Sequence, residues 1–388
     1  MTELIENPRP RVLSGMRPTG RLHLGNYMGA LYNWVKLQHE YECYFFIADY
    51  HALTTDYADT SLLKTNIRDV ALDFLAAGLD PNLCTIFVQS EVHAHFELNS
   101  LLSMITPLSW LERVPSYKDQ QEQLREKDLA TYGFLGYPLL QSADILVYRA
   151  SFVPVGQDQA AHVEITREVA RRFNSLYPGA FHLDANAAPW ELEAITKKAR
   201  KIANDPQKSA FTSQELYQAA LQAKLRSPFL ISHVLPEPEV LLTPSPKLPG
   251  TDGRKMSKSY KNTILISDTE EAVRAKLKTM VTDPDRIRRN DPGNPDVCPV
   301  FDLHKVFSTD VTQQTVREGC TTAGIGCIEC KGWLADALVQ ILAPIQNRRR
   351  YYESNPGEVD EILAAGSRKA NVSANQTMNK VLSVVGLR

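Results

Sequence analysis

Two short segments of the 388-residue chain carry residue types suited to binding phosphate. The first, HLGN at 23–26, follows a turn that contains Gly15 and Gly20, and it predicts a helix start whose free N–H groups and positive dipole end can face an anion. The second, KMSKS at 255–259, places two lysines three residues apart on a loop. Either segment alone is typical of a helix cap or a solvated loop. Together they supply the cations and N–H donors that attack on an α-phosphate requires.

Four of the six cysteines crowd into a stretch of 33 residues. Cys298, Cys320, Cys327 and Cys330 are separated by 21, 6 and 2 residues. Thiols in a reducing compartment are metal ligands or free thiols more often than disulfides. The last two form a CxxC pair, but a zinc ribbon normally contains two such pairs. The spacing therefore predicts a metal site, with a four-thiolate zinc ion and unliganded thiols both open.

Short apolar runs alternate with longer amphipathic segments through the first half of the chain, and this alternation positions the phosphate-binding segments. The runs lie at 11–14, 43–48, 85–89 and 151–155. Between the first two, Tyr27, Leu31, Trp34 and Val35 lie near one face of a helix. The alternation predicts an α/β fold built on a parallel sheet.

The rest of the chain loses this strand rhythm. Two helices are predicted within 178–235, and we interpret their basic residues as a solvated face. Five prolines between Pro236 and Pro249 predict a mobile loop leading into KMSKS. Beyond about Asp268 the pattern is mostly helical, which predicts a second, α-helical domain.

The composition is that of a globular protein, with 43% hydrophobic and 23% charged residues. The 43 basic and 45 acidic residues give a net charge of −2, so a nucleic-acid partner needs a local basic patch. The candidates are Arg286, Arg288 and Arg289, and Arg348, Arg349 and Arg350, although either cluster alone is more typical of a solvated charge run. We find no signal-peptide pattern and no apolar run near the ~18 residues of a membrane span. We therefore expect a cytoplasmic protein with neither a membrane nor DNA as partner.

The two segments resemble the signature motifs of class I aminoacyl-tRNA synthetases, and nearly the whole chain resembles the tryptophanyl-tRNA synthetase family. The discriminating segments are LHLGNYMGAL, QSEVHAH from Gln89, YPLLQSADILVY from Tyr137, VPVGQDQAAHVEITREVARRFN from Val153, and KMSKS. The resemblance implies a Rossmann-type doubly wound parallel sheet as catalytic domain over 9–267. It implies dimerisation through an insertion at about 100–150, and the extra helical insertion at about 178–235 has no assigned role. An α-helical anticodon-recognising domain would cover 268–352, and a helical segment at 353–388 would pack back on the body.

Site residues follow from the resemblance wherever this chain matches the family. ATP, with Mg²⁺, would contact Gly15, His23, Gly25, Asn26, Gly156, Asp158, Lys255, Met256, Ser257 and Lys258. The catalytic residues among these would be His23, Asn26, Lys255 and Lys258. No side-chain nucleophile is required.

Tryptophan would be bound chiefly by Asp144, whose carboxylate accepts the indole N–H. An indole N–H is a donor with no acceptor function, so a carboxylate beside an apolar pocket suits it. Tyr137 would contact the ammonium group, and His51 and Gln159 would line the pocket. Arg17 stands where glutamine is common, so its contact with substrate is left open.

His93 and His95 we interpret as polar residues at a strand end. The cysteine spacing resembles that of a subset of the family with a [4Fe–4S] cluster in the helical domain, which we favour over zinc.

The implied function is ATP-dependent activation of L-tryptophan to tryptophanyl-adenylate, followed by transfer to the 3′-terminal adenosine of tRNA(Trp) by a homodimer. The alternatives are a tyrosyl-tRNA synthetase, a small-molecule nucleotidyltransferase, and a non-catalytic RNA-binding paralogue.

Overall fold

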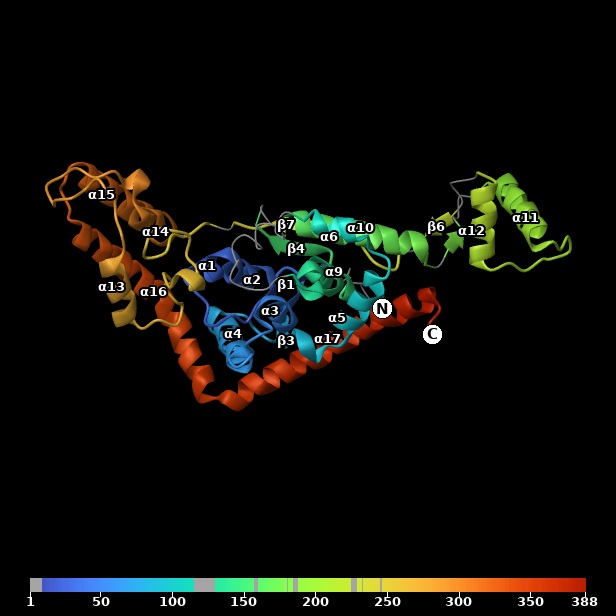
Figure 1. Ribbon diagram of the computed structural model, residues 1–388, viewed down its shortest axis with the longest axis horizontal. Coiled ribbons are helices and arrows are strands. Elements are labelled where there is room, and N and C mark those ends of the chain that lie inside the picture. The colour runs from blue at the N-terminus through green and yellow to red at the C-terminus, as the bar shows by residue number, and fades with distance from the viewer. Residues whose placement is uncertain are drawn as a thin grey trace, which may run out of the picture.

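The computed structural model describes residues 9–114, 130–156, 160–179, 181–183, 188–224, 229–231, 233–244 and 246–388. Its centre is a five-stranded parallel sheet (Figure 1), which confirms the predicted α/β class. The strands are β1 (Arg11–Met16), β2 (Glu42–Ile47), β3 (Cys84–Val88), β4 (Phe152–Val155) and β7 (Glu239–Leu242), in the order β3-β2-β1-β4-β7. The winding direction reverses between β1 and β4. In open α/β sheets, ligands bind at the carboxyl ends of the strands beside such a reversal.

Both faces of the sheet are covered by helices, as expected of parallel strands. One face packs against α1 (Leu24–Asn26), a π-helical turn (Tyr27–Leu31), α2 (Tyr32–Leu37) and α4 (Leu63–Ala77). The other packs against α5 (Ala94–Ser103), α9 (Tyr137–Val147) and α10 (Ala160–Leu176). Side chains of β2 alternate between the two cores, with Phe45 in the first and Tyr44 and Phe46 in the second.

Helix α17 (Pro356–Val385) runs back along the body and packs against β3 (Figure 1). A single glycine allows this close approach. A Cβ atom on Gly366 would lie 1.8 Å from the carbonyl oxygen of Ile86 in β3. Any side chain at this position would therefore force the helix and the strand apart.

The edge strand β7 corrects the prediction of a mobile loop between Pro236 and Pro249. Residues Glu239–Leu242 pair in parallel with β4, in the register Phe152 to Glu239. The flanking prolines had obscured the short run EVLL. Proline is tolerated beside an edge strand because only one side of that strand has to form a ladder.

A two-helix arm projects from the body at the far right of Figure 1. It consists of α11 (Pro189–Ala203) and α12 (Ser213–Gln222), and its base is an antiparallel pair formed by β5 (Phe181–Leu183) and β6 (Phe229–Ile231). Ile195 and Ala199 of α11 pack against Ala219 and Ala220 of α12 in a small separate core.

A helical region lies at the opposite end of the molecule (Figure 1). It contains α13 (Glu270–Thr279), α14 (Pro299–Phe307), α15 (Asp310–Thr321) and α16 (Cys327–Ser354). Its apolar side chains belong to the same core as one face of the sheet, and the domain boundary at 267 stays a prediction. Within the residues that the structure describes, no helix combines the length and apolar character needed to span a membrane.

Candidate active site

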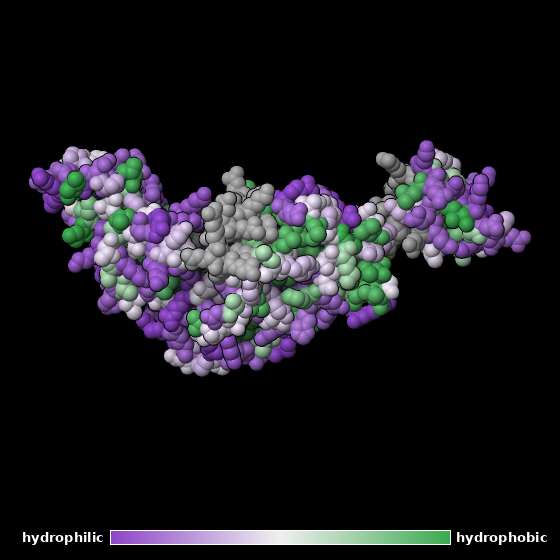
Figure 2. All heavy atoms as spheres, viewed as in Figure 1, coloured by the Kyte–Doolittle hydropathy of each residue, from purple (hydrophilic) through white to green (hydrophobic). Residues whose placement is uncertain are grey.

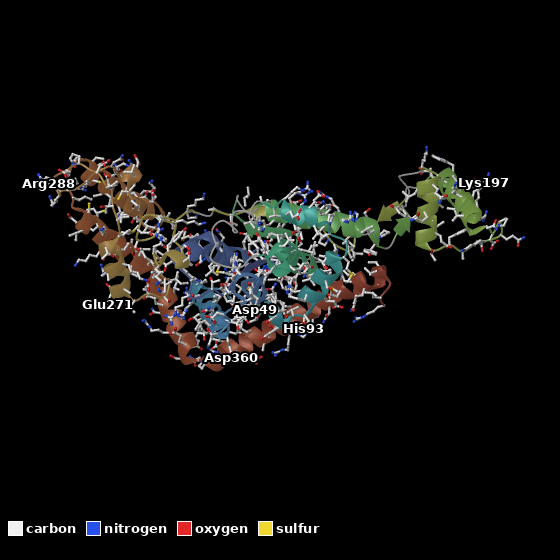
Figure 3. All side chains as sticks on the ribbon, in the orientation of Figure 1. Asp49, His93, Lys197, Glu271, Arg288 and Asp360 are labelled. Atoms are coloured by element: carbon white, nitrogen blue, oxygen red, sulfur yellow. The ribbon has the colours of Figure 1, made fainter. Side chains whose placement is uncertain are left out.

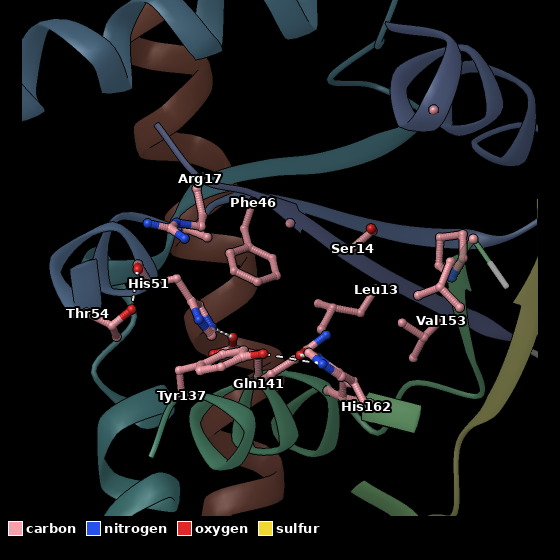
Figure 4. Close-up of a pocket in the computed structure, with 18 residues that line it drawn as sticks. Leu13, Ser14, Arg17, Phe46, His51, Thr54, Tyr137, Gln141, Val153 and His162 are labelled. Carbon is pink, nitrogen blue, oxygen red and sulfur yellow. Dashed lines mark hydrogen bonds and ion pairs between the residues drawn. The ribbon is translucent and has the colours of Figure 1, made fainter. Parts of the chain in front are cut away.

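A cavity of about 450 Å³ opens at the carboxyl ends of β1 and β4, where the strand order reverses. Figure 4 shows Tyr137, His51 and His162 pointing into it from different elements. The lining residues include Ser14, Gly15, Arg17, Phe46, His51, Thr54, Tyr137, Gln141, Asp144, Val153, Gly156 and His162. Five of the residues predicted to bind substrate therefore lie around one cavity. The predicted Asp158 and Gln159 lie outside the described residues.

Asp144 of α9 forms the polar floor of this cavity and is 1% exposed. Its Oδ1 accepts hydrogen bonds from Gln89 Nε2 at 2.7 Å and His95 Nδ1 at 2.6 Å, and its Oδ2 accepts one from His51 Nε2 at 2.7 Å. Burial raises the pKa of Asp144, but His51 and His95 outweigh it and lower the pKa to about 2. The group is therefore a carboxylate at neutral pH. A carboxylate has about four acceptor positions, and three are used by the described residues.

His95 corrects the interpretation as a polar strand-end residue. It is fully buried, and its second ring nitrogen forms a hydrogen bond of 2.8 Å with the hydroxyl of Tyr148. His93 is exposed, at the start of α5 (Figure 3). A signal for His95 existed, because His51 follows β2 and His95 follows β3, and carboxyl ends of adjacent parallel strands share one edge.

A second group of hydrogen-bonded side chains surrounds Tyr137, the predicted contact of the ammonium group. Tyr137 Oη lies 3.3 Å from His162 Nε2, and His162 Nδ1 lies 2.7 Å from Gln141 Oε1. The sequence prediction included Tyr137 but missed His162 and Gln141, which occupy α10 and α9. Both belong to the quoted family segments, and their helical positions alone gave no indication of the cavity.

Gly15 and Arg17 flank the cavity at the end of β1. A Cβ atom on Gly15 would lie 2.4 Å from the ring of Phe46, so glycine is required for this packing. The guanidinium group of Arg17 hydrogen-bonds to Thr55 and forms an ion pair of 3.5 Å with Asp56. Arg17 thus lines the cavity while two of its contacts stay within the protein.

The HLGN segment forms the predicted helix start beside this cavity. His23 is the N-cap of α1, and its Nδ1 accepts from the Asn26 N–H at 3.3 Å while Asn26 Oδ1 accepts from the His23 N–H at 3.2 Å. Burial, followed by Lys258 and Lys255, lowers the pKa of His23 to about 4. His23 is therefore neutral at pH 7 in the protein without bound phosphate. Gly25 is required because a Cβ there would lie 2.9 Å from the His23 ring.

The KMSKS segment, more than 200 residues later in the chain, contacts the turn before α1. Lys258 Nζ donates to the carbonyl oxygen of Gly20 at 2.6 Å, across 238 residues of sequence. Met256 is buried in the core, whereas Lys255 is exposed. Burial lowers the pKa of Lys258 to about 8, against the opposing effect of nearby aspartates. The structure thus brings both predicted phosphate-binding segments together.

The backbone holds the two segments in register. Ile264 accepts a hydrogen bond from the Leu24 N–H at 2.9 Å, and the Ile266 N–H donates to Leu22 at 3.0 Å. His23 and Leu265 form an antiparallel bridge between these bonds. The turn before α1 and the chain after KMSKS therefore form a short ladder.

The four cysteines of the helical region line one small cavity, together with Arg286. Arg286 Nη1 lies 3.6 Å from the sulfur of Cys320. Burial, followed by the proximity of the other three thiols, raises the pKa of Cys330 to about 12. Across the part of the chain that the structure describes, no group of three or more His, Cys, Asp or Glu side chains is placed to hold a metal ion.

Each of the two predicted basic patches contains one buried arginine. Arg286 is 8% exposed and donates to the carbonyl oxygens of Ile325 at 2.7 Å and Arg289 at 3.0 Å. Arg349 is 4% exposed and pairs with carboxylates. Neither side chain is available to a nucleic acid, which corrects their inclusion in the two patches.

Comparison with known proteins identifies the family of the chain. Residues 6–189 and 192–343 match the family model described as tRNA synthetases class I (W and Y). The tryptophan–tRNA ligase of Ralstonia nicotianae is 48% identical, over 97% of this chain and 98% of that protein. That of Thermotoga maritima is 45% identical, over 97% and 99%. The crystal structure of tryptophanyl-tRNA synthetase from Campylobacter jejuni, complexed with ADP and tryptophan, is 30% identical, with a TM-score of 0.75 over 97% of this chain and 100% of that one.

Proposed function

Because the chain belongs to the class I tRNA synthetases for tryptophan and tyrosine, we propose that its cavity binds the amino acid and that the turn before α1 and KMSKS together bind ATP. The chain is an enzyme of the tryptophan–tRNA ligase type, with relatives of that activity matching over nearly its full length. It activates L-tryptophan with ATP to tryptophanyl-adenylate and transfers it to the 3′-terminal adenosine of its tRNA.

Asp144 is the observation that supports tryptophan as the bound side chain. Its carboxylate is fixed by three donors, and one acceptor position is left for a fourth. An indole N–H is a donor only, so it completes the set without leaving a polar atom unpaired. A phenol hydroxyl both donates and accepts, whereas the Asp144 carboxylate only accepts and offers no donor to the phenol oxygen.

On the ATP side, catalysis depends on positioning and charge, since no nucleophilic side chain takes part. Lys258 and Lys255 would face the phosphates, where negative charge grows toward the transition state. His23 and Asn26 would hold the turn through their reciprocal hydrogen bonds. Mg²⁺ bound to the phosphates would neutralise further charge.

The decisive experiment compares ATP–pyrophosphate exchange driven by tryptophan and by tyrosine. The wild-type protein should catalyse exchange with tryptophan but not with tyrosine. Asp144→Asn keeps the size but can turn an N–H toward the indole, so we expect kcat/KM for tryptophan to fall by about 10²-fold with KM for ATP little changed. Exchange supported equally by tyrosine, or an Asn variant with unchanged kcat/KM for tryptophan, contradicts the assignment.

We also propose a [4Fe–4S] cluster on Cys298, Cys320, Cys327 and Cys330. Support comes from the convergence of all four cysteines on one cavity, because a [4Fe–4S] cluster is held by four cysteine thiolates. Zinc is the alternative.

A homodimer is proposed on the surface around the predicted insertion. Met104, Leu108 and Tyr132 are 75%, 60% and 66% exposed, at the end of α5, in α6 (Leu108–Glu112) and in α8 (Tyr132–Leu135). Figure 2 shows hydrophobic residues gathered over α6 and α10. A second copy covering this face would remove it from water.

Charging of tRNA for translation also leads us to propose a cytoplasmic location. We propose that the tRNA contacts the helical region.

A further inference from the structure

Helix α16 joins the four-cysteine region to the catalytic body. It runs for 28 residues from Cys327 to Ser354, which corresponds to about 42 Å of helix. Cys327 and Cys330 lie in its first turn, and its far half packs along α4. Its buried stripe continues through Leu338, Leu342 and Ile345 to Arg349. A charged side chain therefore occupies a position where the helical spacing demands burial.

The buried charge of Arg349 is balanced by three carboxylates. Its Nη1 binds Asp73, its Nη2 donates to Asp69 Oδ1 at 2.6 Å, and its Nε donates to Glu353 Oε1 at 2.8 Å. Asp69 and Asp73 belong to α4, one turn apart. The guanidinium fork thus fixes the end of α16 against α4 through directed contacts that an apolar side chain could not provide.

Asp73 carries the connection on to the active-site turn. It is fully buried, and its second oxygen, Oδ2, accepts the backbone N–H of Leu22 at 2.7 Å. Leu22 directly precedes His23, and Gly20, two residues earlier, accepts the hydrogen bond of Lys258. Asp73 therefore holds the stretch of backbone that both presents His23 and receives Lys258.

We infer that Asp73 is a positioning residue for the ATP-dependent step, and that Arg349 couples the position of α16 to the turn through it. This inference rests on the proposed placement of ATP at that turn. Asp69 serves as the control for Asp73, because it also pairs with Arg349. Its other partner is the side chain of Arg21, at 3.3 Å, whereas Asp73 accepts the backbone N–H of Leu22. If the two aspartates served only to hold Arg349, replacing either one would lower stability and leave kcat unchanged.

The test compares Asp73→Asn with Asp69→Asn in the full-length protein. For each variant, kcat, KM for ATP and KM for tryptophan are measured by pyrophosphate exchange, and urea unfolding gives stability. Both variants lose a buried charge partner, so both should be less stable. We expect Asp73→Asn alone to lower kcat by on the order of tenfold or more, with KM for tryptophan within about twofold, because small displacements of positioned groups cost this much. Equal kcat values for the two variants overturn the inference.

A kinetic double-mutant cycle tests the link to α16. Arg349→Met removes the fork while keeping a long side chain, and Arg349→Lys serves if the Met variant does not fold. If Arg349 acts through Asp73, the loss of kcat in the double variant should be no larger than in Asp73→Asn alone, whereas independent roles multiply the two losses. Arg350→Ala is the matched control, because this neighbour is exposed and its side chain donates to Asn347 rather than to α4 among the described residues; it should change kcat by less than about twofold.

A second pair of variants distinguishes an error in the proposed ATP placement from an error in the role of Asp73. Lys258→Ala and Asn26→Ala probe that placement directly, because both contact the turn itself. If these variants exchange as wild type does, the placement is wrong and the inference falls with it. If they lose exchange while the Asp73 variant does not, only the positioning role of Asp73 is refuted.

Discussion

Raising the pH should remove the positive charge of Lys258 before ATP binds. Burial lowers the pKa of this lysine to about 8, so in the free enzyme it is protonated below that value and neutral above it. The charged fraction is then about 90% at pH 7 and about 10% at pH 9. If only the cation supports the transition state, kcat/KM for ATP should fall by about tenfold between these two values.

The assay is pyrophosphate exchange from pH 6 to 9.5 at saturating tryptophan, with Lys258→Arg as the matched variant. Arginine stays charged throughout, so its profile should lack the descending limb even if its rate is lower. Bound phosphate favours the ammonium form, and the limb in kcat should therefore appear at higher pH than in kcat/KM. His23 is not the cause of the limb in kcat/KM, because its pKa of about 4 leaves it neutral across the range in the free enzyme.

Comparison with the Arg variant also removes effects of pH on the substrates, which both proteins share. If Lys258→Arg keeps the same descending limb, or if wild type shows none below pH 9, the reasoning from the burial of Lys258 is wrong.

Three further outcomes are expected. Gly366→Ala places a methyl group 1.8 Å from the Ile86 carbonyl oxygen, so unfolding in urea should show a loss of about 3 kcal/mol or more, whereas Gly357→Ala, with open space around it, should change little. His95→Leu removes a donor from Asp144 and should cost about 1.5–3 kcal/mol in kcat/KM for tryptophan while KM for ATP holds; loss of ATP affinity instead would argue for general disruption. Anaerobic purification should give a brown protein with about four irons per chain and broad absorbance near ~400 nm. Stoichiometric zinc would replace the cluster, and absence of both metals would eliminate the site.

Sequence patterns identified β2 and β3 because nearly all of their residues are buried and they form short apolar runs. The edge strand β7 was missed for the opposite reason, since it is half-exposed, four residues long and bounded by prolines. The residue types of HLGN and KMSKS predicted phosphate binding, and the resemblance to the family indicated Asp144.

Partners of those residues were harder to predict, because they depend on which strand ends become neighbours. His95 and Gln89 acquire their role only when the end of β3 meets α9. Arg349 shows a signal that was present but overlooked. It lies four residues after Ile345 on the buried stripe of α16, so helical periodicity already separates it from Arg348 and Arg350.

The base of the two-helix arm has a practical consequence for protein engineering. Phe181 and Ile231 are paired across an antiparallel ladder, so the chain leaves the body and returns to it at adjacent points. Paired residues in such a ladder lie only about 5 Å apart, a gap that a tight turn closes. The arm is therefore an exchangeable module. A short turn in its place should leave the body folded, and a foreign domain with neighbouring termini can be grafted there without separating the strands of the catalytic sheet.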